Sequence, residues 1–180
     1  MTSFARGLVL LTFAAAVVFP VHAAAAAEPA VPDTAALEFH GFRAGAHLAE
    51  LQARVLSLDG GPLRCKRAKA DRRVSECRAA LDDPGLGGPV SLWISVIDSV
   101  ASVITISGGV APDQLERWRE AVERRYGRVG ASVQGSQRMM QWVRRGRMLR
   151  LTWRVDRGQR VASVSLVDGR VLDRWGRGPG

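Results

Sequence analysis

The clearest pattern of apolar and polar positions lies in residues 111–130, APDQLERWREAVERRYGRVG. Its apolar stripe recurs at helical spacing and consists of Leu115, Trp118, Val122 and Tyr126. Pro112 suits a first helical position, and Gly127 predicts a left-handed cap at the end. A helix with a single apolar stripe must bury it against another element, so the rest of the chain should supply a sheet.

Strand patterns lie on both sides of this helix. Residues 90–97 and 100–107 are rich in β-branched side chains, and the two residues between them predict a hairpin turn. In residues 147–155, Leu149, Leu151, Trp153 and Val155 alternate with Arg150, Thr152 and Arg154. This period of two is typical of a half-buried strand. Weaker strand patterns occupy 37–42, 63–79, 137–143 and 159–167, and Asp168 with Gly169 predicts a turn into a last strand at 170–174.

A second amphipathic helix is predicted at residues 45–58, where Leu48, Leu51, Val55 and Leu58 form the stripe. We therefore expect an α+β fold in which two helices pack on one face of an antiparallel β-sheet. The order of a helix followed by hairpins occurs twice. It suggests two half-units, 37–110 and 111–175, within a single domain spanning 37–175.

Residues 1–27 are typical of a secretory signal peptide, with Arg6 before an apolar run and small residues after Pro20. Cleavage is expected within residues 23–27. The alternative is a membrane anchor, for which the apolar run is short. Residues 28–36 are expected to form a disordered lead-in and 176–180 a disordered tail. The protein is therefore expected in the periplasm or outside the cell, with no transmembrane span after cleavage.

The chain has two cysteines, Cys65 and Cys77, on the arms of the strand pair predicted at 63–79. An even cysteine count in an exported protein predicts a disulfide, with Cα atoms about 5.5–6 Å apart. The alternative is a redox or metal pair. The spacing is not that of a Cys-x-x-Cys motif, and no further cysteine is present to complete a zinc site.

The chain carries a net charge of +9, and this charge is unevenly spread. Residues 28–110 hold nine basic and ten acidic side chains, whereas 111–180 hold sixteen basic and seven acidic ones. We expect one sheet face to carry a cluster of arginines that consists of Arg138, Arg144, Arg145, Arg147, Arg150, Arg154 and Arg160. Such a face attracts carboxylate or phosphate polyanions, although a solvated basic face is the alternative. Nucleic acid is not the expected ligand of an exported protein.

Candidate chemistry is otherwise sparse. Trp93 is a candidate contact residue if it lies on the open face of its strand. His40 and His47 could share a metal, but a strand-end histidine and a helix-start histidine are commoner. We assign no catalytic residue, no metal site and no cofactor, and we expect a protein that is not an enzyme.

The order of helix, cysteine-bearing hairpin, long hairpin, helix and strands resembles the β-lactamase-inhibitor-protein-like fold over residues 39–170. The small outer-membrane assembly lipoproteins share its helix-then-sheet unit, although this chain lacks their lipid-bearing cysteine. The resemblance implies a protein that acts by binding other proteins and assigns no binding residue.

Two functions follow from these patterns. The first is an exported binding module that engages an acidic protein or an envelope polyanion through the arginine-rich face. The second is an assembly factor that docks another envelope protein through an aromatic sheet surface. An enzyme of unknown type is a third, weaker alternative.

Overall fold

An eight-stranded antiparallel sheet dominates the computed structural model, which describes residues 36–177. Its strands run in the spatial order β3-β4-β5-β6-β10-β9-β8-β7. The strands before α2, β3 to β6, form one half of the sheet, and those after α2, β7 to β10, form the other. The last strand of each half, β6 or β10, lies at the centre. The bounds are β3 (Arg64–Arg67), β4 (Val74–Asp83), β5 (Gly88–Ile97), β6 (Val100–Gly109), β7 (Ser132–Gln134), β8 (Gln137–Arg144), β9 (Arg147–Asp156) and β10 (Gln159–Asp168). All described residues belong to one compact unit.

Tight turns set the register of the long hairpins. Asp98 and Ser99 join β5 to β6 with φ values of 48° and 66°. Arg145 and Gly146 join β8 to β9 in the same way, with φ values of 45° and 75°. Two consecutive residues at positive φ are the mark of a type I′ turn, whose twist matches that of the flanking strands. The two-residue turns therefore confirm the predicted hairpins and fix which side chains lie opposite one another.

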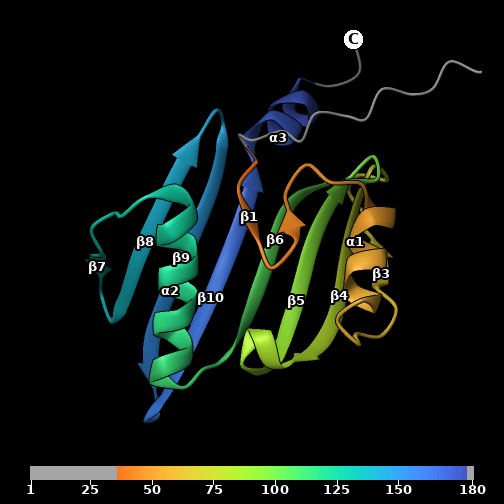
Figure 1. The fold of residues 1–180 in the computed structure, drawn as a ribbon. Helices are drawn as coiled ribbons and strands as arrows, with labels where there is room; N and C mark the ends of the chain where they lie inside the picture. The colour runs from red at the N-terminus through yellow and green to blue at the C-terminus, as the bar shows by residue number, and fades with distance from the viewer. Residues whose placement is uncertain (1–35, 178–180) are drawn as a thin grey trace, which may run out of the picture. The chain divides into compact units, whose positions relative to one another are not determined.

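One face of the sheet is covered by α1 (Leu48–Leu56), by α2 (Pro112–Tyr126) and by the small sheet of β1 (Glu38–Phe39) and β2 (Phe42–Arg43) (Figure 1). In Figure 1, α2 lies in front of β8–β10 and α1 in front of β4, with the β1–β2 hairpin between them. The main hydrophobic core fills this layer. Its largest fully buried side chains include Trp118 of α2, Phe42 of β2 and Leu51 of α1.

The predicted fold class, two helices on one face of a sheet, is wrong. Strands make up 49% and helices 25% of the structure, and a third helix, α3 (Gly169–Gly176), replaces the strand predicted at 170–174. The Asp168 side chain accepts a hydrogen bond from the Arg170 backbone and thereby caps this helix. Aspartate serves in a turn and as an N-cap equally well, so the sequence pattern alone does not separate the two.

Helix α3 lies at one end of the sheet, away from α1 and α2. Val171 of α3 and Ile97 of β5 are both buried, yet neither belongs to the main core. Together with Val100 and Trp175 they line a separate small cavity. Ile97 follows Val96, which faces the main core, so its side chain points to the opposite face of the sheet. Helix α3 therefore closes the rim of the face that α1 and α2 leave open.

Three further predictions need correction. The segment 37–42, predicted as one strand, is a separate two-stranded hairpin with His40 and Gly41 at positive φ. A short strand, β7, lies between α2 and β8, where the sequence pattern predicted no strand. Gly127 ends α2 with φ 89° and ψ 161°, which is not the left-handed helical cap that was expected.

The disulfide between Cys65 and Cys77 is confirmed and joins β3 to β4 at directly opposed positions. Its Cα atoms are 4.0 Å apart, closer than the expected separation. The short distance fits a non-hydrogen-bonded pair of an antiparallel ladder, where facing Cα atoms approach to about 4.5 Å. Disulfides persist in oxidising compartments, so this bond is compatible with export.

Removing the disulfide should lower stability measurably without changing the fold. Replacing Cys65 and Cys77 together by alanine is expected to lower the free energy of unfolding by about 3 kcal/mol, because the bond closes a short loop in the unfolded chain. Denaturant unfolding of wild type and variant measures the difference. Reduced wild-type protein is the control and should match the variant. Equal stability of the oxidised and reduced protein would contradict the prediction.

The predicted signal peptide, residues 28–35 of the lead-in and residues 178–180 of the tail lie outside the described residues. Gly176 and Arg177, which were also assigned to the tail, end α3. Within residues 36–177, no helix is long and apolar enough to cross a membrane.

Candidate binding surface

The sheet face that points away from α1 and α2 is the candidate surface, and we call it the open face. Residues alternate between the two faces along each strand. Ile94 and Ile104 are completely buried under the helices, whereas their neighbours Trp93 and Thr105 are only half-buried. The same alternation holds on β9, where Leu149 and Leu151 lie in the core. The open face is therefore formed by every second residue along each strand, namely those that alternate with the core residues.

A single transverse row crosses the open face, because directly paired residues share a face. Pairing across seven strands brings together, in order, Arg64, Arg78, Trp93, Thr105, Ser165, Arg150 and Gln141. Arg78 and Arg150 are four strand spacings apart, or about 19 Å at about 4.8 Å per strand. The row thus has arginines on both sides of a centre with small side chains, and Trp93 stands beside the Arg78 end.

Small side chains form the middle of the open face. The hydroxyls of Thr105 and Ser165 lie 3.3 Å apart across β6 and β10 and form a hydrogen bond. The neighbouring row continues this character with Ser91, Ser107, Ser163 and Thr152. No bulky side chain rises between Trp93 and Arg150 in this region, so a partner's side chains can reach the strands themselves.

The seven predicted arginines do not gather on one face. Arg150 and Arg154 lie on the open face, as the period of two predicts. The remaining five are Arg138, Arg144, Arg147 and Arg160, whose register places them on the helix-covered side, and Arg145, which lies in the β8–β9 turn. The hairpin register divides these arginines between the two faces, and the sequence of one strand does not report that register.

Arg144 and Arg147 have structural roles on the helix side. Arg144 donates to the Tyr126 carbonyl oxygen at 2.8 Å and lies over the Tyr126 ring. The Arg147 side chain is 7% exposed, and its Nε donates to the Asp168 carboxylate at 3.0 Å. Asp168 also accepts from Arg170, at the start of α3. These two arginines anchor α2 and α3 and are not free to meet a partner.

The arginines of the row keep much of their charge uncompensated. Arg150 donates through Nε and a terminal nitrogen to the side-chain oxygen of Gln141, which is neutral. Arg64 has no hydrogen-bond or ion-pair partner within the described part of the chain. Arg78 lies 3.7 Å from Glu76, a pair in which both side chains are more than half exposed. Arg154 pairs with Asp156 at 3.4 Å in a similarly exposed setting. Such exposed pairs contribute little and exchange readily with a partner's charges.

Arg64 and Arg78 were not among the predicted site residues, although the positions of the two cysteines in the sequence could have identified them. The basic stretch 64–78 contains both, and the disulfide pairs Cys65 with Cys77. Opposed cysteines place the residues on either side of them opposite one another, so Arg64 must face Arg78.

Metal-binding side chains do not cluster in the described part of the chain. No group of three or more His, Cys, Asp or Glu side chains within residues 36–177 could hold a metal ion. His40 lies near Asp83 and Arg54, and burial lowers its pKa while Asp83 partly opposes this shift. Its contacts are structural, since Arg54 donates to the His40 carbonyl oxygen at 2.9 Å.

One strongly shifted carboxyl belongs to the contact between α3 and the β3–β4 loop. A hydrogen bond from Trp175 Nε1 at 2.8 Å, with further bonds from Arg73, lowers the pKa of Asp71 to about 2. Asp71 is half-buried and faces no nucleophile or second carboxyl in these contacts. It fixes the end of α3 to the loop and does not form a reactive pair.

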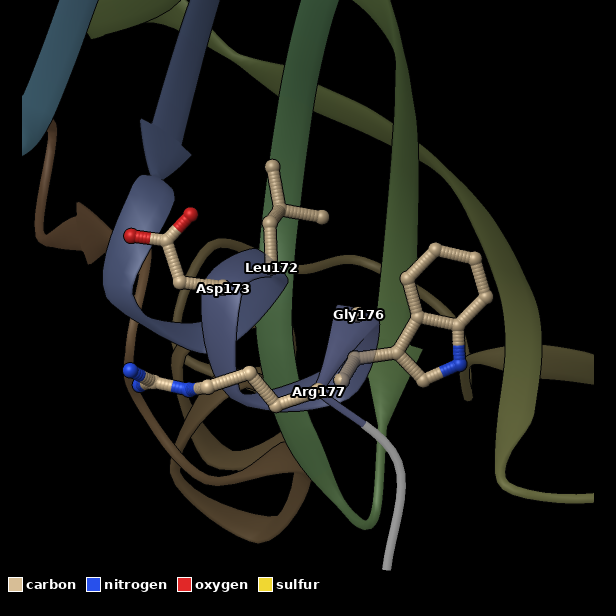
Figure 2. A pocket seen from close by; sticks show the side chains of 5 residues that line it. Leu172, Asp173, Gly176 and Arg177 are labelled. Carbon is tan, nitrogen blue, oxygen red and sulfur yellow. The ribbon is translucent and has the colours of Figure 1, made fainter.

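The hollows of the described surface are shallow. The hollow on α3 is lined by Leu172, Asp173, Trp175, Gly176 and Arg177. Figure 2 shows that the labelled side chains of Leu172, Asp173 and Arg177 point in different directions and do not converge on one point. A second groove, described below, runs beside β4 and is lined by Arg64 and Arg78 among others. The open face differs from these hollows in carrying an aligned row of side chains across several strands.

Comparison with known proteins returns no match among family models, curated proteins or solved structures.

Proposed function

We propose that this chain is an exported, non-catalytic binding module whose open face docks an acidic surface of another protein. The transverse row supports this proposal most directly, because it combines Trp93 with arginines on both sides of a centre of small residues. Tryptophan and arginine are the residues that most often dominate the energy of protein interfaces. The proposal of export rests on the disulfide and on the apolar N-terminal segment of the sequence.

The arginines specify a partner that carries carboxylates. Arg150 is held by the Gln141 amide and not by an acid, so its guanidinium is oriented while its charge remains available. A guanidinium binds a carboxylate through two parallel hydrogen bonds, which an amide oxygen does not replace. The partner should present acidic groups about 19 Å apart, matching Arg78 and Arg150 across four strand spacings.

An acidic protein fits the open face better than an envelope polyanion does. A polymer of regular charge would need a continuous cationic track, and the arginines expected to form one lie on both faces and in a turn. Between the charged ends, the open face offers hydroxyls and apolar side chains such as Val103 and Val167, which pair across strands. A folded protein surface can match such a mixture, with a charged rim around a less polar centre.

Docking that depends mainly on Trp93 is the second candidate, and it corresponds to an assembly factor for another envelope protein. Trp93 is half-buried among neighbours of the same face, so part of its ring is available for contact. Salt separates the two candidates. Binding through arginines should weaken as ionic strength rises, whereas binding through the indole ring should change little.

Removing the two open-face arginines of β9 should weaken partner capture and leave the fold intact. We expect Arg150→Ala/Arg154→Ala to lose about tenfold or more in affinity for an acidic envelope protein, since each charged contact is worth about 1–3 kcal/mol. The melting temperature should barely move, because exposed arginines contribute little to stability. The measurement is capture from the native envelope fraction at about 0.1 M and about 0.5 M salt.

The matched control is Arg124→Ala/Arg138→Ala, which removes the same charge from the helix-covered side. It should capture the partner as the wild type does. Equal loss in both variants would reduce the effect to net charge and contradict the proposal. Recovery of a lipid or polysaccharide in place of a protein would favour the polyanion.

A further inference from the structure

The two outer strands of the sheet are short, and this leaves part of β4 without a neighbour. Strand β3 pairs only with residues 75–78 of β4, which itself runs on to Asp83. In the continued register the residue opposite Ala80 would be Pro62, which has no backbone N–H. Pairing therefore stops at Arg64, and residues 79–83 of β4 form a free edge.

The backbone groups of Ala80 and Asp82 point outward from this free edge. The Ala68 N–H donates to the Val74 carbonyl oxygen at 2.9 Å, so the backbone of Val74 faces the β3 side. Backbone groups alternate in direction along an antiparallel strand, and the even-numbered residues of β4 therefore face the same way. Those of Ala80 and Asp82 have no hydrogen-bond partner within residues 36–177, and both residues are exposed.

A groove runs along the free edge and carries charge at one end. It is lined by Gly61, Pro62, Arg64, Arg78, Ala79 and Ala80, with a volume of about 410 Å³. Arg64 and Arg78 stand side by side as a directly opposed pair at the junction with β3. The exposed carboxylate of Asp82 lies toward the other end of the edge. The alanines offer no bulk to obstruct an added chain.

From these features we propose that the free edge of β4 binds an extended segment of another protein as an additional strand, with acidic side chains placed at Arg64 and Arg78. Backbone hydrogen bonds to Ala80 and Asp82 would supply the pairing, and the two arginines would supply the preference for acidic sequence. Asp82 disfavours a further acidic residue at the opposite end. This inference goes beyond the proposed function. Arg64 and Arg78 belong to both surfaces, but Ala80→Pro blocks only the edge, and Arg150→Ala/Arg154→Ala changes only the open face.

Charged residues on a sheet edge also have another known effect, which is to discourage pairing between identical chains. If Arg64 and Arg78 serve only in this way, no strand should add at the edge. A second copy of the chain is a further occupant that the test must distinguish.

The test uses the full exported chain and a fluorescent peptide of about eight residues, the length of an ordinary strand. The peptide alternates threonine and valine and carries two glutamates at one end. Two control peptides carry lysines in place of the glutamates, or proline at every second position. We expect the acidic peptide to bind at least about tenfold more tightly than either control. Its binding should slow hydrogen exchange at the Ala80 and Asp82 amides, whereas Ala79 and Leu81, which already face β5, should change little.

The Ala80→Pro variant blocks the edge, because proline is tolerated where an edge N–H points to solvent. It should fold, keep its melting temperature and lose at least about tenfold in peptide affinity. Should this variant fail to fold, Arg64→Glu/Arg78→Glu tests the same site and should prefer the lysine peptide. The Arg124→Ala/Arg138→Ala variant should bind as wild type.

Binding by the proline peptide, protection at other amides, or undiminished binding by a folded Ala80→Pro variant would overturn the inference. So would a dimer that Ala80→Pro dissociates, because it would assign the edge to a second copy.

Discussion

Replacement of Asp168 by alanine is expected to lower the free energy of unfolding by about 3–5 kcal/mol. The Asp168 carboxylate is 1% exposed and accepts hydrogen bonds from Arg147 and Arg170, each at 3.0 Å. It also caps α3 through the Arg170 backbone. Removing it takes away a carboxylate to which the buried Arg147 guanidinium donates, and reducing the compensation of a buried charge is costly.

Denaturant unfolding measures this loss, and two variants calibrate it. Asp168→Asn keeps the shape and the capping oxygen but loses the charge, so its cost should lie between those of wild type and alanine. Asp156→Ala breaks an exposed pair with Arg154 and should cost less than about 1 kcal/mol. Hydrogen exchange in α3 should accelerate in the Asp168 variants before the rest of the sheet opens. A loss below about 1 kcal/mol for Asp168→Ala would show that the ion pair does not hold α3.

The second large effect is expected at Trp118, the residue of α2 that reaches deepest into the core. Trp118 is 1% exposed and meets Phe39 of β1 in an edge-to-face contact with ring centres 5.2 Å apart. Trp118→Ala should therefore cost about 3–5 kcal/mol, the usual range for deleting a large buried aromatic side chain.

Phenylalanine at the same position separates packing from hydrogen bonding. The Trp118 Nε1 atom is buried and has no hydrogen-bond partner among the described residues. Trp118→Phe removes this unpaired donor while keeping an aromatic ring, so its cost should be less than about half that of alanine. Thermal unfolding of both variants decides the matter, with Arg124→Ala on the exposed side of α2 as control. Equal costs for phenylalanine and alanine would mean that the indole nitrogen has a partner after all.

The sequence predicted the structure correctly where a short-range pattern is compatible with only one local structure. The period of two in residues 147–155 placed Leu149 and Leu151 in the core and Arg150 on the open face. The paired cysteines predicted the disulfide, and their opposition also implied the meeting of Arg64 and Arg78. The two-residue turn at Asp98 and Ser99 predicted the hairpin of β5 and β6 correctly, because both residues take the positive φ of a type I′ turn.

Errors arose where distant residues decide between local alternatives. Asp168 caps α3 in a setting where its carboxylate also pairs with Arg147, which lies on another strand. The pattern of Asp168 and Gly169 alone suits a turn as well as a helix start, so the helix could not be predicted from it. The transverse row depends on β6 lying beside β10, a pairing between strands separated by the whole of α2 and three further strands. No short-range pattern reports such a contact, so Trp93 could not be placed in line with Arg150.

Site-specific photo-crosslinking from the open face tests the proposed function most directly. A photoreactive amino acid in place of Thr105 lies at the centre of the transverse row, and one in place of Leu56, which is exposed on α1, serves as the control. We predict that the Thr105 position, in the native envelope, forms an adduct with an acidic protein that disappears in the Arg150→Ala/Arg154→Ala background. The Leu56 position should form none. An adduct with the same protein only from Leu56, or an adduct from Thr105 that persists without the two arginines, would contradict docking through the open face.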